Sequence, residues 1–151
     1  MPRQGLTLLE LLVVLGLLGV LAGLAYRSSL LAHRERAALA ELHAILRQAR
    51  AEAIRRADWV AVNLLEGRLV LCLDSNGNGR CEPGERVLRR WDPRAYGASL
   101  ELYPGFQAGL RYNALGQLNT GGRLVLRVGG RATALCLGLA GRVREVRGER
   151  C

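Results

Sequence analysis

The chain has 151 residues, half of them hydrophobic, a length that suits one domain with a modest core and leaves no room for several. Its net charge is +9, every basic residue is an arginine, and residues 86–151 carry twelve arginines against four acidic residues. This asymmetry indicates a polyanionic partner for the C-terminal half, either nucleic acid or an anionic surface, although a solvated basic face would give the same composition.

The first element in chain order is an apolar stretch from Leu6 to Ala25, in which Thr7 and Glu10 are the only polar residues. Twenty such residues are enough for a membrane-spanning helix. A secretory signal would instead need a shorter apolar run followed by a small-residue cleavage site, and no such site follows here. Neither interpretation explains Glu10, because a carboxylate inside a membrane is costly and usually has a partner.

Residues 5–10 read Gly-Leu-Thr-Leu-Leu-Glu after a short basic leader, and this stretch resembles the N-terminus of type IV prepilins and pseudopilins. The resemblance implies a leader peptide over 1–5, cleavage after Gly5 by a prepilin peptidase, and N-methylation of Leu6. It also implies that Glu10 serves assembly by neutralising the N-terminal amine of a neighbouring subunit, since a buried carboxylate is tolerable when paired. The first mature residue of this family is more often Phe or Met than Leu.

Helical periodicity continues beyond the apolar stretch. One stripe with spacings of three and four residues consists of Leu39, Leu42, Leu46, Ala49 and Ala53. We therefore expect a membrane and assembly helix over 6–30 and an amphipathic helix over 31–58 that packs by this stripe. His33 and His43 fall on the amphipathic helix as surface or packing residues.

Short strands bounded by turn residues are expected after the helix, over residues 59–64, 68–73, 86–91, 99–103, 123–128, 132–139 and 142–146. Glu66-Gly67 and Gly129-Gly130 are typical of hairpin turns, and Asp92-Pro93 and Pro104-Gly105 also indicate turns. The pattern predicts an α+β fold in a soluble domain over 31–151, with a long helix packed on a mostly antiparallel sheet over 59–151.

Residues 46–56 read LRQARAEAIRR and resemble a helix of the FimT/GspH branch of pilin-like proteins. Tyr112–Gly116 and Gly141–Arg144 stand where this branch has similar segments. The resemblance implies a pilin-like fold and a minor pilin or minor pseudopilin.

The four cysteines stand at positions 72, 81, 136 and 151. They include no Cys-x-x-Cys pair and no neighbouring histidine, which argues against a zinc site. An even number behind an export-like segment fits disulfides in an oxidising compartment. Three connectivities remain open, of which we favour pairing of neighbours, Cys72 with Cys81 and Cys136 with Cys151.

Residues 74–85 match the calcium-loop pattern D-x-[DN]-x-[DN]-G-x5-E. Oxygen ligands would come from Asp74, Asn76, Asn78, the carbonyl group of Arg80 and Glu85. The alternative is a hairpin loop rich in Asn and Gly, in which Cys72 faces Cys81 and Arg68 forms a cross-strand ion pair with Glu85. No cofactor other than this calcium ion is expected.

At the last predicted strand stand Gly141, Arg142 and Arg144, which resemble a GRxR-type motif. In FimT-like competence pilins, this motif is associated with DNA binding. On a strand, Arg142 and Arg144 would point the same way and lie roughly 6.6 Å apart, so they could bind successive phosphates. Further arginines of the same half are Arg123, Arg127, Arg131 and Arg147. The alternative is an edge strand that charge protects from pairing.

These features predict a minor type IV pilin that binds double-stranded DNA non-specifically for uptake in natural transformation. The alternative is a structural subunit without DNA binding, either a type II secretion pseudopilin or a pilus-priming minor pilin. The resemblance implies a single-pass inner-membrane precursor that later enters a periplasmic or surface filament with other pilins. No Ser-His-Asp grouping, paired-carboxylate pattern or phosphate-cradling loop is evident, so we expect no catalytic residues and no enzyme.

Overall fold

The computed structural model describes residues 7–103 and 109–151, without the side chains of residues 24, 25, 27 and 28. The chain divides into two compact units, residues 1–33 and residues 34–151. The expected leader, its cleavage position between Gly5 and Leu6, and the predicted turn at Pro104-Gly105 lie outside the described residues.

Helix α1 spans Leu8–Arg56. It begins after Thr7, whose Oγ1 accepts a hydrogen bond from the backbone N–H of Glu10 at 3.3 Å, as an N-cap residue does. In the first unit, the large apolar side chains from Leu8 to Leu21 are between 47% and 80% exposed. Within the described residues, no helix has a stretch both long and apolar enough to cross a membrane.

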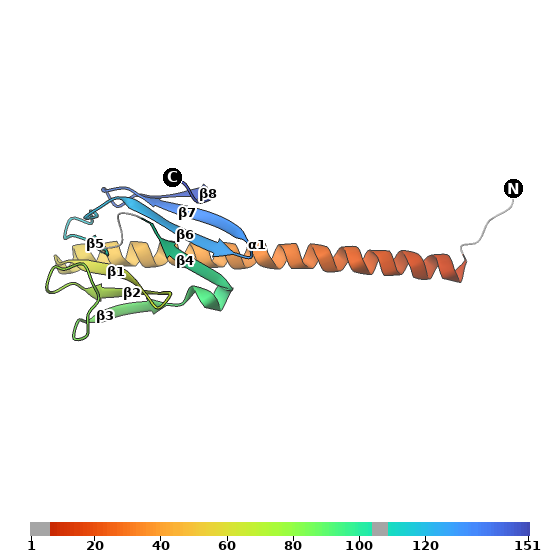
Figure 1. The fold of residues 1–151 in the computed structure, drawn as a ribbon, viewed down its shortest axis with the longest axis horizontal. Coiled ribbons are helices and arrows are strands. Elements are labelled where there is room, and N and C mark those ends of the chain that lie inside the picture. The colour runs from red at the N-terminus through yellow and green to blue at the C-terminus, as the bar shows by residue number, and fades with distance from the viewer. Residues whose placement is uncertain (1–6, 104–108) are drawn as a thin grey trace. The chain divides into compact units, whose positions relative to one another are not determined.

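The second unit contains the last part of α1 and two antiparallel sheets of four strands each. The strands are β1 (Val60–Leu65), β2 (Arg68–Leu73), β3 (Val87–Trp91), β4 (Ala98–Leu102), β5 (Leu110–Tyr112), β6 (Gly122–Val128), β7 (Arg131–Leu137) and β8 (Val143–Arg147). One sheet has the order β3-β2-β1-β5 and the other β4-β6-β7-β8, and both lie along the C-terminal half of α1 (Figure 1). A short 3-10 helix, Pro93–Tyr96, connects β3 to β4.

The core lies between α1 and the inner faces of both sheets. The residues of α1 in this core are Ala38, Leu42, Ile45, Leu46, Ala49 and Ala53. The predicted stripe is thus largely present, but Leu39 is only half-buried, and Ala38 and Ile45 are buried in addition. Alternate residues of β6 and β7, among them Leu124, Leu126 and Leu135, meet this stripe. The α+β fold with an N-terminal helix packed on antiparallel strands is therefore confirmed.

Two expectations about strand pairing need correction. The structure has two sheets instead of one, and β5 was missed because three residues are too few to show an alternating pattern. The expected Arg68–Glu85 pair is also wrong, because β2 pairs with β3 through Leu69 and Trp91. In this register Arg68 lies beside Asp92, and its Nε is 3.1 Å from Asp92 Oδ2.

Candidate nucleic-acid interface

The outer face of the β4-β6-β7-β8 sheet points away from the core and carries a row of four residues. Arg123 is opposite Cys136, and Cys136 is opposite Arg144 on the edge strand β8. On the other side of Arg123, the backbone N–H of Tyr103 donates to the carbonyl oxygen of Arg123 at 3.2 Å. Neighbouring residues on paired strands share a face, so strand pairing brings two arginines and a tyrosine together.

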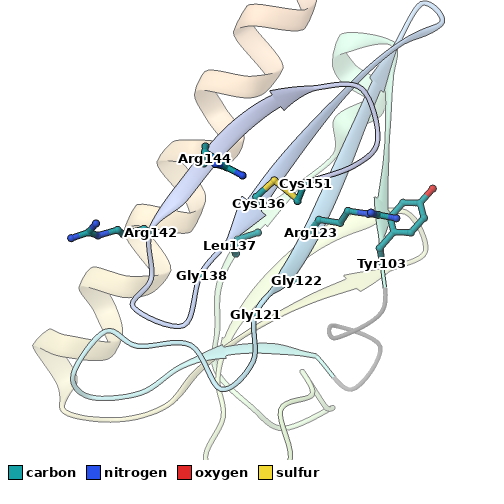
Figure 2. Close-up of a pocket in the computed structure, with 10 residues that line it drawn as sticks. All are labelled: Tyr103, Gly121, Gly122, Arg123, Cys136, Leu137, Gly138, Arg142, Arg144 and Cys151. Carbon is teal, nitrogen blue, oxygen red and sulfur yellow. A yellow bond between two sulfur atoms is a disulfide. The ribbon is translucent and has the colours of Figure 1, made fainter.

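A groove of about 760 Å³ follows this row (Figure 2). Its lining consists of Tyr103, Gly121, Gly122, Arg123, Cys136, Leu137, Gly138, Arg142, Arg144 and Cys151. The guanidinium carbon of Arg123 lies 4.4 Å from the ring centroid of Tyr103, a cation–π arrangement. Arg123 Nε is buried and has no hydrogen-bond partner among the described residues. The groove therefore combines positive charge with an apolar and glycine-rich floor.

Arg142 and Arg144 both line the groove, but the expectation that they point the same way is wrong. Arg142 precedes β8, which begins at Val143, so the alternation of a strand does not apply to it. Figure 2 shows the two guanidinium groups pointing in opposite directions, that of Arg144 toward the Cys136–Cys151 disulfide and that of Arg142 away from it. The two residues could therefore contact different parts of one long anion.

The other predicted arginines do not join this group. Arg127 is bound on both sides by carboxylates, with its Nε 3.1 Å from Glu101 and its Nη1 2.5 Å from Glu149. Arg131 Nη1 lies 3.6 Å from Glu35 of α1. Arg147 follows Arg144 by three positions on β8, so the two side chains point to opposite faces of the sheet. Arg147 therefore lies on the face opposite the groove.

The ion pairs of Arg127 change the pKa values of their partners. Its hydrogen bond lowers the pKa of Glu149, and together with the Tyr103 hydroxyl it lowers the pKa of Glu101. Glu149 and then Glu101 raise the pKa of Arg127 in return. The positive charge of Arg127 is thus neutralised by Glu101 and Glu149 and is less available to a phosphate.

The C-terminal tail, residues 148–151, is tied to the outer face at two points. Cys151 forms a disulfide with Cys136, and Glu149 pairs with Arg127. Val125 and Ala134 alternate with core residues yet are fully buried, as expected for a face that the tail covers. The other disulfide joins Cys72 to Cys81, so both bridges connect neighbouring cysteines, the pairing favoured above.

Gly141 has a structural position beside this groove. Its φ is 75°, and an added Cβ would lie 2.6 Å from the carbonyl oxygen of Gly116 and 3.3 Å from Arg50. A Cβ on Gly116 would lie 2.8 Å from Arg50 Nε. Segments 46–56, 112–116 and 141–144, which resemble the FimT/GspH branch, therefore meet around one arginine side chain.

The comparisons with known proteins agree with this geometry. Residues 38–141 match the family model described as Type II transport protein GspH, and residues 1–26 match the prokaryotic N-terminal methylation motif. The chain belongs to the GspH family. The matched residues include most of α1 in the second unit and all strands except β8, so the family covers most of this unit.

The relatives of this GspH-family chain are pilin-like proteins. It is 46% identical over 91 residues to the pilin-like protein PilA1 of Thermus thermophilus, covering 56% of this chain and 57% of that protein. The minor pilin FimU of Pseudomonas aeruginosa matches with a TM-score of 0.55 and 22% identity, covering 74% of this chain and 91% of FimU. The minor pseudopilin EpsH of Vibrio cholerae matches with a TM-score of 0.53 and 16% identity, covering 75% and 95%. The two solved structures confirm a pilin-like fold.

The sequence alone did not identify Tyr103 as a groove residue, or Arg50 as the side chain beside which Gly116 and Gly141 lie. Tyr103 reaches Arg123 only because β4 and β6 are paired, and twenty residues separate them in the sequence. Arg50 lies off the apolar stripe and resembles its solvated neighbours. An unusual concentration of glycine at 121, 122, 138 and 141 was the available signal, because glycine permits close approach of a backbone to other groups.

Proposed function

We propose that this chain is a minor pilin of a type IV filament and that the outer-face groove binds DNA. The observation that carries the proposal is the gathering of Arg123, Arg142 and Arg144 around one groove. Guanidinium groups bind phosphates bidentately, and the exposed glycine backbone of the floor permits close approach. Contacts to phosphates carry no sequence information, so binding through these arginines would be independent of sequence.

Delivery to the filament would follow the methylation motif. In this proposal a prepilin peptidase cuts after Gly5, Leu6 is N-methylated, and α1 anchors the precursor in the inner membrane until assembly. Glu10 would then pair with the new amine of a neighbouring subunit. Its partner in the structure, Thr7, caps the start of α1, and this cap leaves the carboxylate free for such a role.

The test is a DNA titration against salt with the full chain in detergent. Replacing Arg142 and Arg144 by Gln should weaken affinity for duplex DNA at least tenfold. It should also lower the slope of log K against log salt by roughly 1.8, about 0.9 for each phosphate that an arginine no longer neutralises. The matched control replaces Arg36 and Arg90, which are exposed and do not line the groove. It removes the same charge and should keep most of the affinity.

Two results would contradict the proposal. One is the absence of any complex between the wild-type chain and duplex DNA at low salt. The other is an equal loss of affinity in both double variants, because the interaction would then depend on net charge alone.

A structural role without DNA binding is the second candidate, and an apolar patch favours it. Ile54, Leu115 and Leu139 are 49%, 73% and 62% exposed. The segments that carry them lie close together, because a Cβ on Gly116 would lie 2.7 Å from Ile54 Cδ1 and the N–H of Leu118 donates to the carbonyl oxygen of Leu139. Exposed apolar groups of this kind are typical of contacts with other proteins, here another pilin or pseudopilin.

A further inference from the structure

The loop between β2 and β3 folds its polar side chains back onto its own backbone. Asp74 Oδ2 accepts from the N–H of Gly79 at 3.0 Å, and Asn76 Oδ1 accepts from the N–H of Asn78 at 3.0 Å. Asn78 Oδ1 accepts from the N–H of Arg80 at 2.7 Å. These residues occupy the first, third, fifth, sixth and seventh positions of the twelve-residue calcium pattern.

The other oxygen of Asp74 is the observation that points to a ligand. The Asp74 side chain is 0% exposed, and its Oδ1 has no hydrogen-bond partner among the described residues. Oδ2 of the same carboxylate binds Gly79 within the loop, so the unpaired oxygen belongs to a side chain that the loop itself holds in place. A buried carboxylate oxygen without a partner is costly, and a bound cation would remove this cost.

Glu85, at the twelfth position, lies beside the same place. Its Oε1 accepts from the N–H of Ser75 at 3.1 Å, and its Oε2 accepts from the N–H of Glu82 at 3.1 Å. Ser75 follows Asp74 directly, so the Glu85 carboxylate lies against the backbone segment that carries Asp74. Each oxygen of Glu85 keeps a further lone pair for a metal ion.

The loop is held in shape from outside. Asn63 on β1 donates to the carbonyl oxygen of Gly79 at 2.9 Å and accepts from the N–H of Cys81. The Cys72–Cys81 disulfide closes its base. A loop that is already ordered loses little entropy when it binds an ion.

One arginine already contributes positive charge there. Arg111 Nη1 lies 3.5 Å from Asp74 Oδ2 and donates to the carbonyl oxygen of Gly77, and its guanidinium stacks on Trp59 at 4.4 Å. It contacts Oδ2 and leaves Oδ1 unpaired. Because it partly neutralises the Asp74 carboxylate, any metal ion should bind weakly.

We propose that residues 74–85 bind one calcium ion through Asp74, Asn76, Asn78, the carbonyl group of Arg80 and Glu85. In the described part of the chain, no three His, Cys, Asp or Glu side chains are grouped as a metal centre. The proposed set instead combines two carboxylates with amide and carbonyl oxygens, a mixture that calcium accepts in flexible geometry. A site of this low charge belongs with extracellular modules that bind at about 0.1–1 mM.

The test uses the full chain in detergent, freed of metal with a chelator, and needs no DNA. Thermal unfolding is followed with increasing CaCl2, and with MgCl2 at the same ionic strength. At ten times its Kd, calcium should raise the folded-to-unfolded ratio about elevenfold. Terbium luminescence sensitised by Trp59 gives a second readout, because the Trp59 carbonyl oxygen accepts from the N–H of Asp74.

Two ligand variants and one control complete the test. Glu85→Gln and Asn76→Ala should remove the calcium effect, whereas Glu66→Gln removes an exposed carboxylate of the β1–β2 hairpin and should keep it. Asn76 is exposed, so its variant should fold even if Glu85→Gln does not. No calcium effect on the wild-type chain, an equal effect of magnesium, or an effect retained in Asn76→Ala with unchanged terbium luminescence would overturn the proposal.

Discussion

Gly141 shows how one residue can be determined by a distant part of the chain. It lies in the turn between β7 and β8, where the N–H of Gly141 donates to the carbonyl oxygen of Gly138 at 2.8 Å. Its positive φ alone disfavours other residues, and the backbone of Gly116 leaves no room for a side chain. The first glycine of the predicted Gly-Arg motif is therefore explained by packing.

We predict that Gly141→Ala destabilises the fold more than Gly148→Ala does. Both positions have a positive φ, but a Cβ on Gly148 would meet no atom within 4 Å. The control should lose about 1–2 kcal/mol from backbone strain alone, and Gly141→Ala should lose more because Gly116 must move. Urea unfolding of both variants measures the difference, and equal losses would show that the contact with Gly116 is unimportant.

At the scale of elements, α1 is attached to both sheets by polar side chains as well as by its apolar stripe. Glu41 accepts from Arg89 of β3 at 2.8 Å and from the hydroxyl of Tyr96. Glu35 accepts from Thr133 of β7 at 3.0 Å, and His43 Nε2 lies 2.5 Å from Glu145 of β8. These contacts fix the rotation of the helix, which apolar packing alone specifies less precisely.

The contact of Glu41 predicts a dependence of stability on acid. The Tyr96 hydroxyl, and then Arg89, lower the pKa of Glu41 below its usual 4.5. Its stabilising contribution is therefore present above the pKa of the unfolded chain and is lost as the pH falls through the lower folded pKa. Glu41→Gln should be less stable than the wild type at pH 7, and the gap should close below pH 4.5. Urea unfolding across this range checks it, and a constant gap would rule out the titration.

At the scale of the molecule, the second unit presents the groove of Arg123, Arg142 and Arg144 and the patch of Ile54, Leu115 and Leu139. The turn from Gly138 to Arg142 contributes to both, because Leu139 belongs to the patch and Arg142 to the groove. In the proposed function, the groove binds DNA and the patch binds another filament subunit. A filament subunit that holds DNA would need both.

Separate variants should distinguish these two surfaces. Leu115→Ser with Leu139→Ser should reduce entry into the filament and leave the DNA affinity of the purified chain unchanged, because both side chains are exposed and the groove stays intact. The Arg142 and Arg144 double variant should do the reverse. Immunodetection in sheared filaments and the DNA titration measure both effects, and normal entry of the leucine variant would exclude the patch as an assembly contact.

Local patterns were sufficient to predict much of this molecule. The apolar stripe of α1, seven of the eight strands and the glycine turns at residues 67 and 130 all depend on neighbours in sequence, and the structure contains them. Pairing between distant strands could not be predicted in the same way. The split into two sheets, the position of β5 and the partner of Arg68 all follow from contacts between residues far apart in the chain.

The sequence by itself determined the class of the protein, because the methylation motif and the helix periodicity lie in short contiguous segments. It also singled out the C-terminal half as the basic one. Only the tertiary structure decided which arginines meet, since folding pairs Arg127 and Arg131 with carboxylates and places Arg123 and Arg144 in the lining of one groove. Charge depends on composition, but the availability of a charge depends on its neighbours in space.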